Sequence, residues 1–353
     1  MTTKFFWRRL WVSALVCFIS SLVVAQETQE TQAPPTEENT NRSYVLATAT
    51  TGGTFYPMGV AIATVSKVKL EPKTGISLSA ISSAGSAQNI DFLRNDQAQF
   101  AILQSLYGAW AWNGTGELSA QGAYKQLRAV TTLWHNVEHF VLHKQFVKSG
   151  TLADLQELSA INFSLGLPGS GSEGSGRYIL SALGIVPETV FTLNPLGYGP
   201  ASDALQNGII SGMYTPGGVP VNAVSRAFAT VGENLAILNI TDEQLATINQ
   251  QYPLWLRYSI PADSYPKQTD VINSIAQGNL LVVRDDVSEE AVYQIVKMIY
   301  ENLSFLQTIH KSASAIALEY ALNALPMPLH PGALKYYQEQ GLTIPDNLRM
   351  TTN

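Results

Sequence analysis

The chain has 353 residues, of which 46% are hydrophobic and 14% are charged, so its composition is that of a globular protein with room for two domains. This composition excludes a disordered or fibrous chain. The formal net charge of −6, with no stripe of Lys and Arg, excludes a nucleic-acid partner, because neutralising phosphates requires such a stripe.

Residues 1–25 have the pattern of a secretory signal peptide. Basic residues precede an apolar run at 10–24, and Val23-Val24-Ala25 offers small residues at a cleavage site. The apolar run is shorter than the roughly 20 residues of a membrane span, so an uncleaved anchor is the weaker alternative. We expect cleavage after Ala25, a periplasmic location and no stable membrane insertion. Cleavage also removes Cys17, the only cysteine, and with it any thiol chemistry.

Residues 26–42 contain mostly Gln, Thr, Glu and Pro with no large apolar side chain, which predicts a flexible acidic tether. Strands are then expected at 44–49, 76–81 and 100–103, separated by small-residue turns and by helices such as 56–69. This rhythm predicts a parallel sheet with crossover helices. Two further strands, at 130–133 and 139–142, would carry the chain out of the first lobe.

The same rhythm restarts near residue 162. Strands are expected at 162–167, 190–193, 209–214 and 235–240, and helices at 177–183, 201–206 and 219–228. An apolar run at 280–283 could cross back, and an amphipathic pattern predicts one long helix over 288–310 with Ser288 as N-cap. The fold class is therefore α/β, with lobe I at residues 43–136 plus 241–353, lobe II at 137–240, and a hinge and cleft between them.

Three loops share one design, in which a strand end leads through small hydroxyl and glycine residues into a helix. They are TGGTFY at 51–56, SSAGS at 82–86 and GSGSE at 169–173. Glycine lets the backbone approach a ligand, and a helix N-terminus offers free N–H groups with a partial positive charge. An ordinary N-cap is the alternative for any one loop, but three such loops in both lobes indicate a site for a carboxylate.

The candidate ligand-binding residues come from these loops and from neighbouring strand ends: Gly53, Thr54, Tyr56, Ser83, Ser86, Gln104, Ser105, Ser170, Ser172, Glu173, Tyr214 and Gly218. Among the aromatic residues near the loops, Tyr56 and Tyr214 are favoured because each adjoins a Gly- or Pro-rich turn. The loops contain no Arg or Lys, so neutral donors and helix ends are expected to hold the ligand reversibly. Glu173 could pair with a ligand ammonium, or could simply be a first-turn helix charge.

Two other chemistries are weighed and set aside. Gly169, Gly171 and Gly174 match G-x-G-x-x-G, but no acidic residue follows the strand at 190–193, so no dinucleotide or other cofactor is expected. No nucleophile-and-base motif occurs, so no catalytic residue is expected. A periplasmic enzyme that uses Glu173 with the nearby serines is kept as a rival function.

His135, Glu138, His139 and His143 have the residue types of a metal site. Strand alternation, however, places Glu138 on the face opposite His139 and His143. A structural role is therefore favoured, and no metal is expected.

Seven short motifs follow one another along the chain: TGGTFYP at 51–57, SAGSAQN at 83–89, QS at 104–105, NGTG at 113–116, PGSGSE at 168–173, GVP at 218–220 and PLHPGA at 328–333. In this order they resemble the TAXI family of solute receptors for TRAP transporters, over nearly everything after the tether. His139 falls where that family usually has a histidine, which favours its structural role. Ala84-Gly85 replaces a frequent pair of glycines, and Tyr214 leads into Pro216 where the family has an Asp-rich strand end.

The resemblance implies a type II-like periplasmic binding protein that closes on a hinge and has no catalytic activity. Its ligand would be a glutamate-like amino acid or a dicarboxylate. It would deliver this small carboxylate to the inner-membrane subunits of a TRAP permease driven by an ion gradient. A periplasmic protein that senses the same ligand for a membrane signalling partner is the alternative function.

Overall fold

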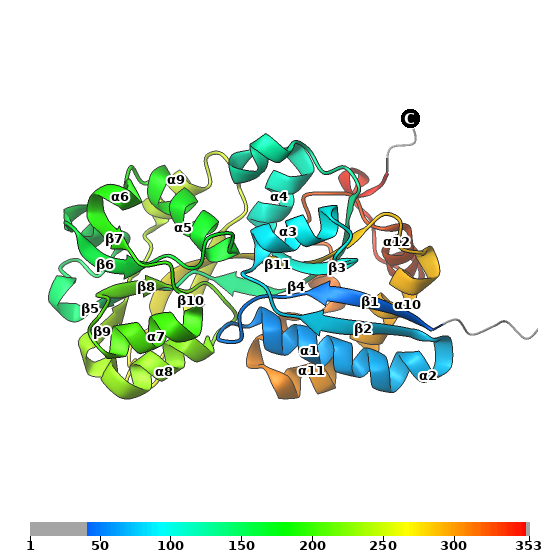
Figure 1. The fold of residues 1–353 in the computed structure, drawn as a ribbon, viewed down its shortest axis with the longest axis horizontal. Helices are drawn as coiled ribbons and strands as arrows, with labels where there is room; N and C mark the ends of the chain where they lie inside the picture. The colour runs from blue at the N-terminus through cyan, green and yellow to red at the C-terminus, as the bar shows by residue number, and fades with distance from the viewer. Residues whose placement is uncertain (1–40, 351–353) are drawn as a thin grey trace, which may run out of the picture. The chain divides into compact units, whose positions relative to one another are not determined.

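The structure is a computed structural model that describes residues 41–350. The described residues form an α/β structure with two separate sheets, which confirms the predicted fold class (Figure 1). The signal peptide predicted for residues 1–25, and all but the last two residues of the predicted tether, lie outside the described residues.

The first sheet has six strands and is parallel on one side only. Its order is β10-β11-β3-β1-β2, with β4 also paired to β11. The strand β1 is parallel to β2 and to β3, whereas β11 runs antiparallel to β3, β4 and β10. The strands are β1 (Arg42–Ala47), β2 (Ile76–Ile81), β3 (Phe100–Gln104), β4 (Leu127–Val137), β10 (Leu256–Ile260) and β11 (Ile272–Arg284).

The second sheet has five shorter strands in the order β7-β6-β8-β5-β9. Here β6 is parallel to β7 and β8, and β5 is antiparallel to β8 and β9. The strands are β5 (Phe140–His143), β6 (Ile161–Ser164), β7 (Phe191–Leu193), β8 (Gly212–Tyr214) and β9 (Leu235–Ile237). We call the elements around the first sheet the first lobe and those around the second sheet the second lobe.

Helices cover both faces of each sheet (Figure 1). Among residues 41–350, none of them is long and apolar enough to cross a membrane. The helices are α1 (Phe55–Val65), α2 (Glu71–Thr74), α3 (Ser86–Arg94), α4 (Ser105–Asn113), α5 (Gly171–Ala182), α6 (Pro187–Val190), α7 (Tyr198–Gln206), α8 (Asn222–Val231), α9 (Asp242–Ile248), α10 (Glu289–Glu301), α11 (Leu303–Ile309) and α12 (Pro331–Glu339).

The backbone passes between the sheets on either side of the second lobe. It enters β5 from β4 through Glu138 and His139, and it returns between β9 and β10. The apolar run at 280–283, which could have made this crossing, has another place in the fold. It lies within β11, a strand of 13 residues whose paired neighbours β3 and β4 bury it in the first sheet.

Two helices differ from the sequence prediction. The helix expected over 288–310 is broken at Asn302, whose φ of −126° and ψ of 27° are not helical. The side-chain Nδ2 of Asn302 donates to the carbonyl of Met298 at 2.8 Å. The helix expected to begin at Arg177 begins at Gly171 instead, so the Gly/Ser-rich segment is helical. Ser170 caps it by accepting a hydrogen bond from the backbone N–H of Glu173 at 3.0 Å, which offsets the low helix propensity of glycine.

Candidate ligand-binding site

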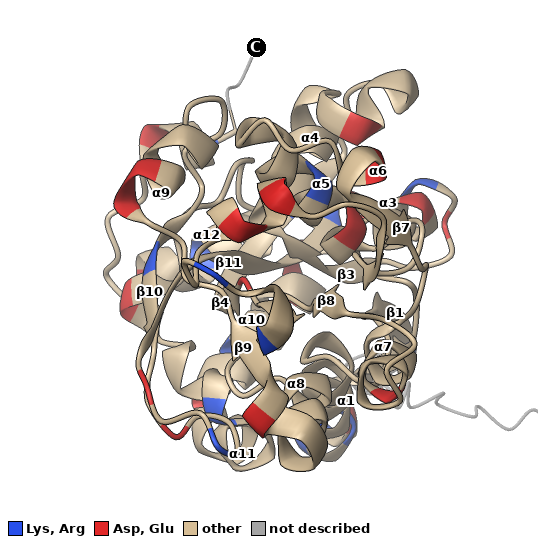
Figure 2. Cartoon of the chain, turned by 90° about the vertical axis from the view of Figure 1, so that its left-hand side faces the viewer, with Lys and Arg blue, Asp and Glu red and all other residues tan. Residues whose placement is uncertain are grey.

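A cavity of about 40 Å³ lies where the two lobes meet. None of its lining residues is charged, although charged residues are common on outer helices such as α5, α6 and α9 (Figure 2). The lining consists of Ala49, Thr50, Gly53, Thr54, Phe55, Ala84, Gly85, Ser86, Gln104, Asn136, Ser170, Gly171, Ser172, Tyr198, Pro216 and Gly217. Any ligand held here is therefore held by neutral groups of the described chain.

Five helices begin at this cavity, because each follows a strand whose carboxyl end points toward it. They are α1, α3 and α4 from the first lobe and α5 and α7 from the second, and the cap or first residue of each lines the cavity. The first-turn N–H groups of a helix have no partner inside the helix and carry a partial positive charge. Five converging N-termini make the cavity a favourable place for an anion.

Two buried amide side chains in the cavity lack hydrogen-bond partners. Gln104 is 3% exposed and Asn136 is 1% exposed, and both line the cavity. Neither Oε1 of Gln104 nor Nδ2 of Asn136 has a partner. A buried polar atom left unpaired costs about 1–3 kcal/mol, so two of them at one cavity indicate a place for a polar ligand. Only Nδ2 of Asn136 is a donor that can bond to an anion, whereas Oε1 of Gln104 accepts and would need a hydroxyl or N–H of the ligand.

The hydroxyl groups of the cavity are ordered by local bonds. Ser170 and Ser172 share a hydrogen bond of 2.9 Å between their Oγ atoms, and the Oγ of Ser86 accepts from the backbone N–H of Gln104 at 3.1 Å. The hydroxyl of Tyr198 donates to the carbonyl of Pro216 at 2.6 Å. Burial raises the pKa of Tyr198, so this phenol stays neutral.

The lobes touch directly beside the cavity. The backbone N–H of Gln88 donates to the carbonyl of Gly169 across the lobes at 3.1 Å. Gly171 also faces the first lobe so closely that a Cβ there would lie 2.6 Å from the Oγ of Ser86 and 2.9 Å from the Cδ of Gln104. The absence of a side chain at Gly171 therefore permits this close approach.

Of the twelve residues predicted to bind the ligand, six line the cavity: Gly53, Thr54, Ser86, Gln104, Ser170 and Ser172. The other six, namely Tyr56, Ser83, Ser105, Glu173, Tyr214 and Gly218, do not. Among these six, Tyr56 is partly buried in the first turn of α1, and Gly218 supports a lining residue directly. Gly218 bonds through its N–H to the Oγ1 of Thr54 at 3.1 Å, and Ser105 donates to the carbonyl of Gly278 at 3.1 Å.

Three more residues of this group are bonded to neighbours other than the lining residues' side chains. Ser83 lies 2.6 Å from the Oδ1 of Asn89 and organises its own loop, and Glu173 pairs with Arg177 at 3.3 Å. Tyr214 is buried and bonds to the carboxyl group of Glu138.

Sequence reasoning missed several lining residues, of which Asn136 and Tyr198 matter most. Tyr198 stands in a Gly-Tyr-Gly-Pro turn after β7, which has the same strand-turn-helix design as the three recognised loops. Asn136 lies near the end of β4, and only its pairing with β11 brings it to the cavity. The turn at Tyr198 was therefore a local signal that sequence reasoning could have found, whereas Asn136 carried no such signal.

Glu138 is fully buried at the crossing between the lobes. Its carboxyl group accepts from Nε1 of Trp255 at 2.7 Å and from Nε2 of Gln277 at 3.3 Å, and it bonds to the hydroxyl of Tyr214. Burial raises the pKa of Glu138 to about 7, although these hydrogen bonds lower it. It does not line the cavity, and its hydrogen bonds connect β8 of the second sheet with β11 of the first.

His139 is fully bonded within the protein. Its Nδ1 lies 2.8 Å from the carbonyl of Val137, and its Nε2 lies 2.7 Å from the hydroxyl of Tyr265. Burial lowers the pKa of His139 to about 4, so the ring is neutral and donates from Nδ1. In the part of the chain that the structure describes, no three His, Cys, Asp or Glu side chains are grouped to hold a metal.

Comparison with known proteins gives one family and several structures. Residues 46–341 match the NMT1-like family. The chain is similar to the binding-protein component of a phosphonate ABC transporter from Pseudomonas aeruginosa, with 14% identity and a TM-score of 0.47 over 77% of this chain and 79% of that one. It is also similar to MatC from Rhodopseudomonas palustris with bound malate, with 17% identity and a TM-score of 0.48 over 85% and 96%.

Proposed function

The chain belongs to the NMT1-like family, and from the geometry of its cavity we propose that it is a periplasmic solute-binding protein that holds a small organic anion between its lobes and delivers it to a membrane transporter. The observation that carries this proposal is the convergence of five helix N-termini and the unpaired buried amide donor of Asn136 on one cavity. Each helix end contributes about 0.3–1 kcal/mol toward a nearby negative charge, and each hydrogen bond to the anion about 1.5–3 kcal/mol.

We further propose that the anion is a carboxylate without an ammonium group. The sequence left a glutamate-like amino acid and a dicarboxylate both open, and it offered Glu173 as the partner of an ammonium. Glu173 pairs with Arg177 and does not line the cavity, and no other carboxylate of the described residues lines it. A ligand ammonium would therefore meet five positive helix ends with no counter-charge, which favours a plain mono- or dicarboxylate.

The absence of catalysis is part of the proposal. The hydroxyls of Ser170 and Ser172 bond to each other, and no His, Asp or Glu of the described residues lines the cavity to act as a base. A serine nucleophile needs such a base within hydrogen-bond reach. The neutral lining instead favours reversible binding, since it lacks the bidentate grip of an arginine.

The partner and the location rest on the sequence motifs. The resemblance to TAXI receptors supports a TRAP permease as the transporter, and the N-terminal pattern supports export with cleavage after Ala25. A sensor that reports the same ligand to a membrane signalling protein remains the second candidate. Pull-down of solubilised permease subunits by the ligand-bound protein would support transport, and capture of a receptor kinase instead would support sensing.

A thermal-shift screen with matched ligand pairs tests the binding function. We would compare succinate with aspartate, 2-oxoglutarate with glutamate, and lactate with alanine, with glucose as the neutral control. A ligand at 100 times its Kd adds about 2.7 kcal/mol of stability. We expect the member of each pair that lacks an ammonium group to raise the Tm more than the corresponding amino acid. Stabilisation by glucose alone would contradict the anion site, and stronger stabilisation by the amino acids would contradict only the absence of an ammonium site.

A further inference from the structure

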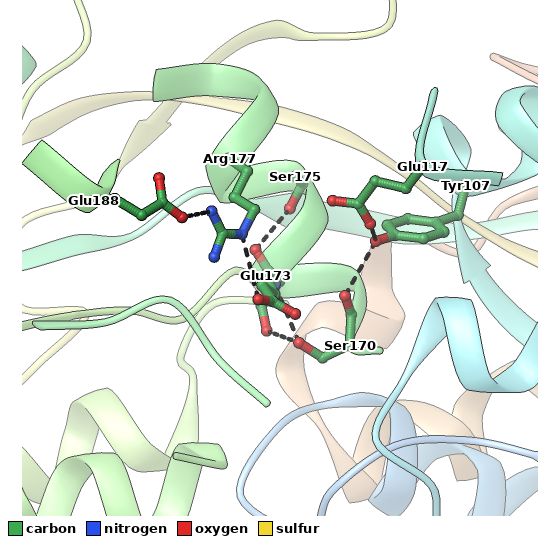
Figure 3. Close-up of polar contacts among 8 residues, drawn as sticks. Tyr107, Glu117, Ser170, Glu173, Ser175, Arg177 and Glu188 are labelled. Carbon is green, nitrogen blue, oxygen red and sulfur yellow. Dashed lines mark hydrogen bonds and ion pairs between the residues drawn. The ribbon is translucent and has the colours of Figure 1, made fainter. Parts of the chain in front are cut away.

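A short chain of polar groups joins the lobes beside the cavity (Figure 3). Tyr107 on α4 is completely buried, and its hydroxyl oxygen lies 2.7 Å from Oε2 of Glu117. The same hydroxyl lies 3.2 Å from the backbone carbonyl oxygen of Ser170. Tyr107 and Glu117 belong to the first lobe, whereas Ser170 is the N-cap of α5 in the second lobe.

The single hydrogen of the Tyr107 hydroxyl group decides which of these contacts are hydrogen bonds. A phenol has one hydrogen, but Tyr107 faces two acceptors. When Glu117 is ionised, the hydrogen goes to the carboxylate, which is the closer and stronger acceptor, and the Ser170 carbonyl faces a bare oxygen. When Glu117 is protonated, it donates to Tyr107, and Tyr107 is free to donate to Ser170. One proton on Glu117 therefore completes the bond between the lobes.

We propose that Glu117 and Tyr107 form a proton-dependent clasp that holds the lobes closed and positions the N-terminus of α5 at the cavity. This inference rests on the lobe closure of the proposed function, but it concerns residues that do not line the cavity. Both are positioning residues, since they act on the ligand only through the backbone of Ser170.

The backbone at the N-terminus of α5 has room for the Tyr107 hydroxyl and a carbonyl that can accept from it. The carbonyl of Ser170 accepts the first helical hydrogen bond from Gly174 at a long 3.5 Å, which leaves it open to a second donor. A Cβ on Gly174 would overlap the hydroxyl of Tyr107 and lie 2.7 Å from Oε2 of Glu117. Only glycine at this position lets the helix approach the clasp so closely.

The charges that face Glu117 all come from α5. They are the carboxylate of Glu173 and the guanidinium of Arg177, and Arg177 is itself paired with Glu173 and with Glu188 on α6 (Figure 3). Partial burial raises the pKa of Glu117, and Glu173 raises it further, while the Tyr107 bond and Arg177 oppose the change.

The sign of the pH effect follows from this direction. In this closed structure the pKa of Glu117 is raised, because burial and Glu173 of the second lobe outweigh the opposing effects of the Tyr107 bond and of Arg177. We take an ordinary glutamate in water as the open state. Closed protein therefore binds the proton more readily than open protein. Closure is favoured below the ordinary pKa of a glutamate, about 4.3, and is lost as the pH rises through the closed-state value.

Distances between two spin labels test the clasp without any ligand. The exposed Ser119 and Thr189 lie near Glu117 and Glu188 on opposite lobes, so we would label Ser119→Cys and Thr189→Cys in the Cys17→Ser chain. Distance distributions are compared at about pH 4, below the ordinary glutamate pKa, and at about pH 8, where an ordinary glutamate is ionised. We expect the short-distance population of the parent protein to fall as the pH rises, because the clasp loses its proton.

Three variants separate the clasp from other pH effects. Glu117→Gln keeps a permanent donor to Tyr107, so its closed population should be high and independent of pH. Tyr107→Phe and Gly174→Ala should be open at both pH values, the first because it lacks the hydroxyl and the second because its methyl group displaces the helix. Glu157 carries an exposed carboxyl group that pairs with Lys148, so Glu157→Gln is the matched control and should behave as the parent.

Two results would overturn the clasp. One is a parent protein whose distances do not change with pH, and the other is a Glu117→Gln variant that keeps the parent's pH dependence. The second result would assign the titration to another group. Failure of every anion in the thermal-shift screen would contradict the proposed ligand but would leave this readout unaffected.

Discussion

Replacement of Gln104 by methionine should change stability and ligand binding in opposite directions. The side chain is 3% exposed, and its Oε1 has no hydrogen-bond partner. Its backbone, in contrast, is held by pairing of β3 with β11 and by the bond from its N–H to Ser86. Methionine has nearly the same length and shape, so Gln104→Met removes the unpaired amide and leaves the strand intact.

The magnitudes follow from the burial of this amide. An unpaired buried polar atom costs about 1–3 kcal/mol, so the ligand-free variant should be as stable as the parent or more stable by up to about that amount. The Nε2 group of the same side chain can donate to a carboxylate, whereas Oε1 cannot. A hydrogen bond to a charged ligand contributes about 1.5–3 kcal/mol, so the Kd should rise by roughly 10- to 150-fold. A residue with a purely structural role would not show this combination.

Urea unfolding and isothermal titration with the best anion from the screen measure the two quantities. Gln268→Met is the matched control, because Gln268 is also buried but its amide bonds to the carbonyl of Pro261 at 3.1 Å and to the N–H of Tyr265 at 3.2 Å. That control should lose stability and keep the parent's affinity. Lower stability of Gln104→Met with an unchanged Kd would refute the reasoning.

Three further predictions concern neighbouring groups. Burial raises the pKa of Glu138 to about 7, so the protonated side chain stabilises the fold fully below the ordinary glutamate pKa, and this stabilisation is lost as the pH rises to about 7. Glu138→Gln should therefore remove about 3 kcal/mol of the pH dependence of the free energy of unfolding in urea. An unchanged pH profile would contradict this prediction. Ser172→Ala should weaken anion binding by about 1 kcal/mol in titration without lowering the Tm, since Ser170 still caps α5. Tyr265→Phe should lower the free energy of unfolding by about 1–3 kcal/mol, because Val221 N–H and His139 Nε2 lose their partner; a change below about 0.5 kcal/mol would count against this.

The parts of the site that are local in sequence could be predicted. Each of the three recognised loops joins a strand to the helix that follows it, and the turn residues and the cap lie within six positions of one another. Such a unit needs no knowledge of the rest of the fold. The α/β class followed from the same repeated units, and the structure confirms it.

The parts that depend on strand pairing could not be predicted. Asn136 reaches the cavity only because β4 pairs with β11, a strand that lies more than 130 residues later in the chain. The roles of Glu173 and Tyr214 were also missed, because their partners Arg177 and Glu138 compete with any ligand. Only the pairing of β8 with β5 brings Tyr214 to Glu138. A sequence shows which side chains are polar but not which of them are already bonded.

A crystal structure with the tightest-binding carboxylate of the screen tests the central claim most directly. We predict carboxylate oxygens within about 2.7–3.2 Å of first-turn N–H groups of α5 and of the Asn136 amide, with no Lys or Arg side chain in contact. A carboxylate bound by a lysine or arginine, or bound outside the cavity, would contradict the account.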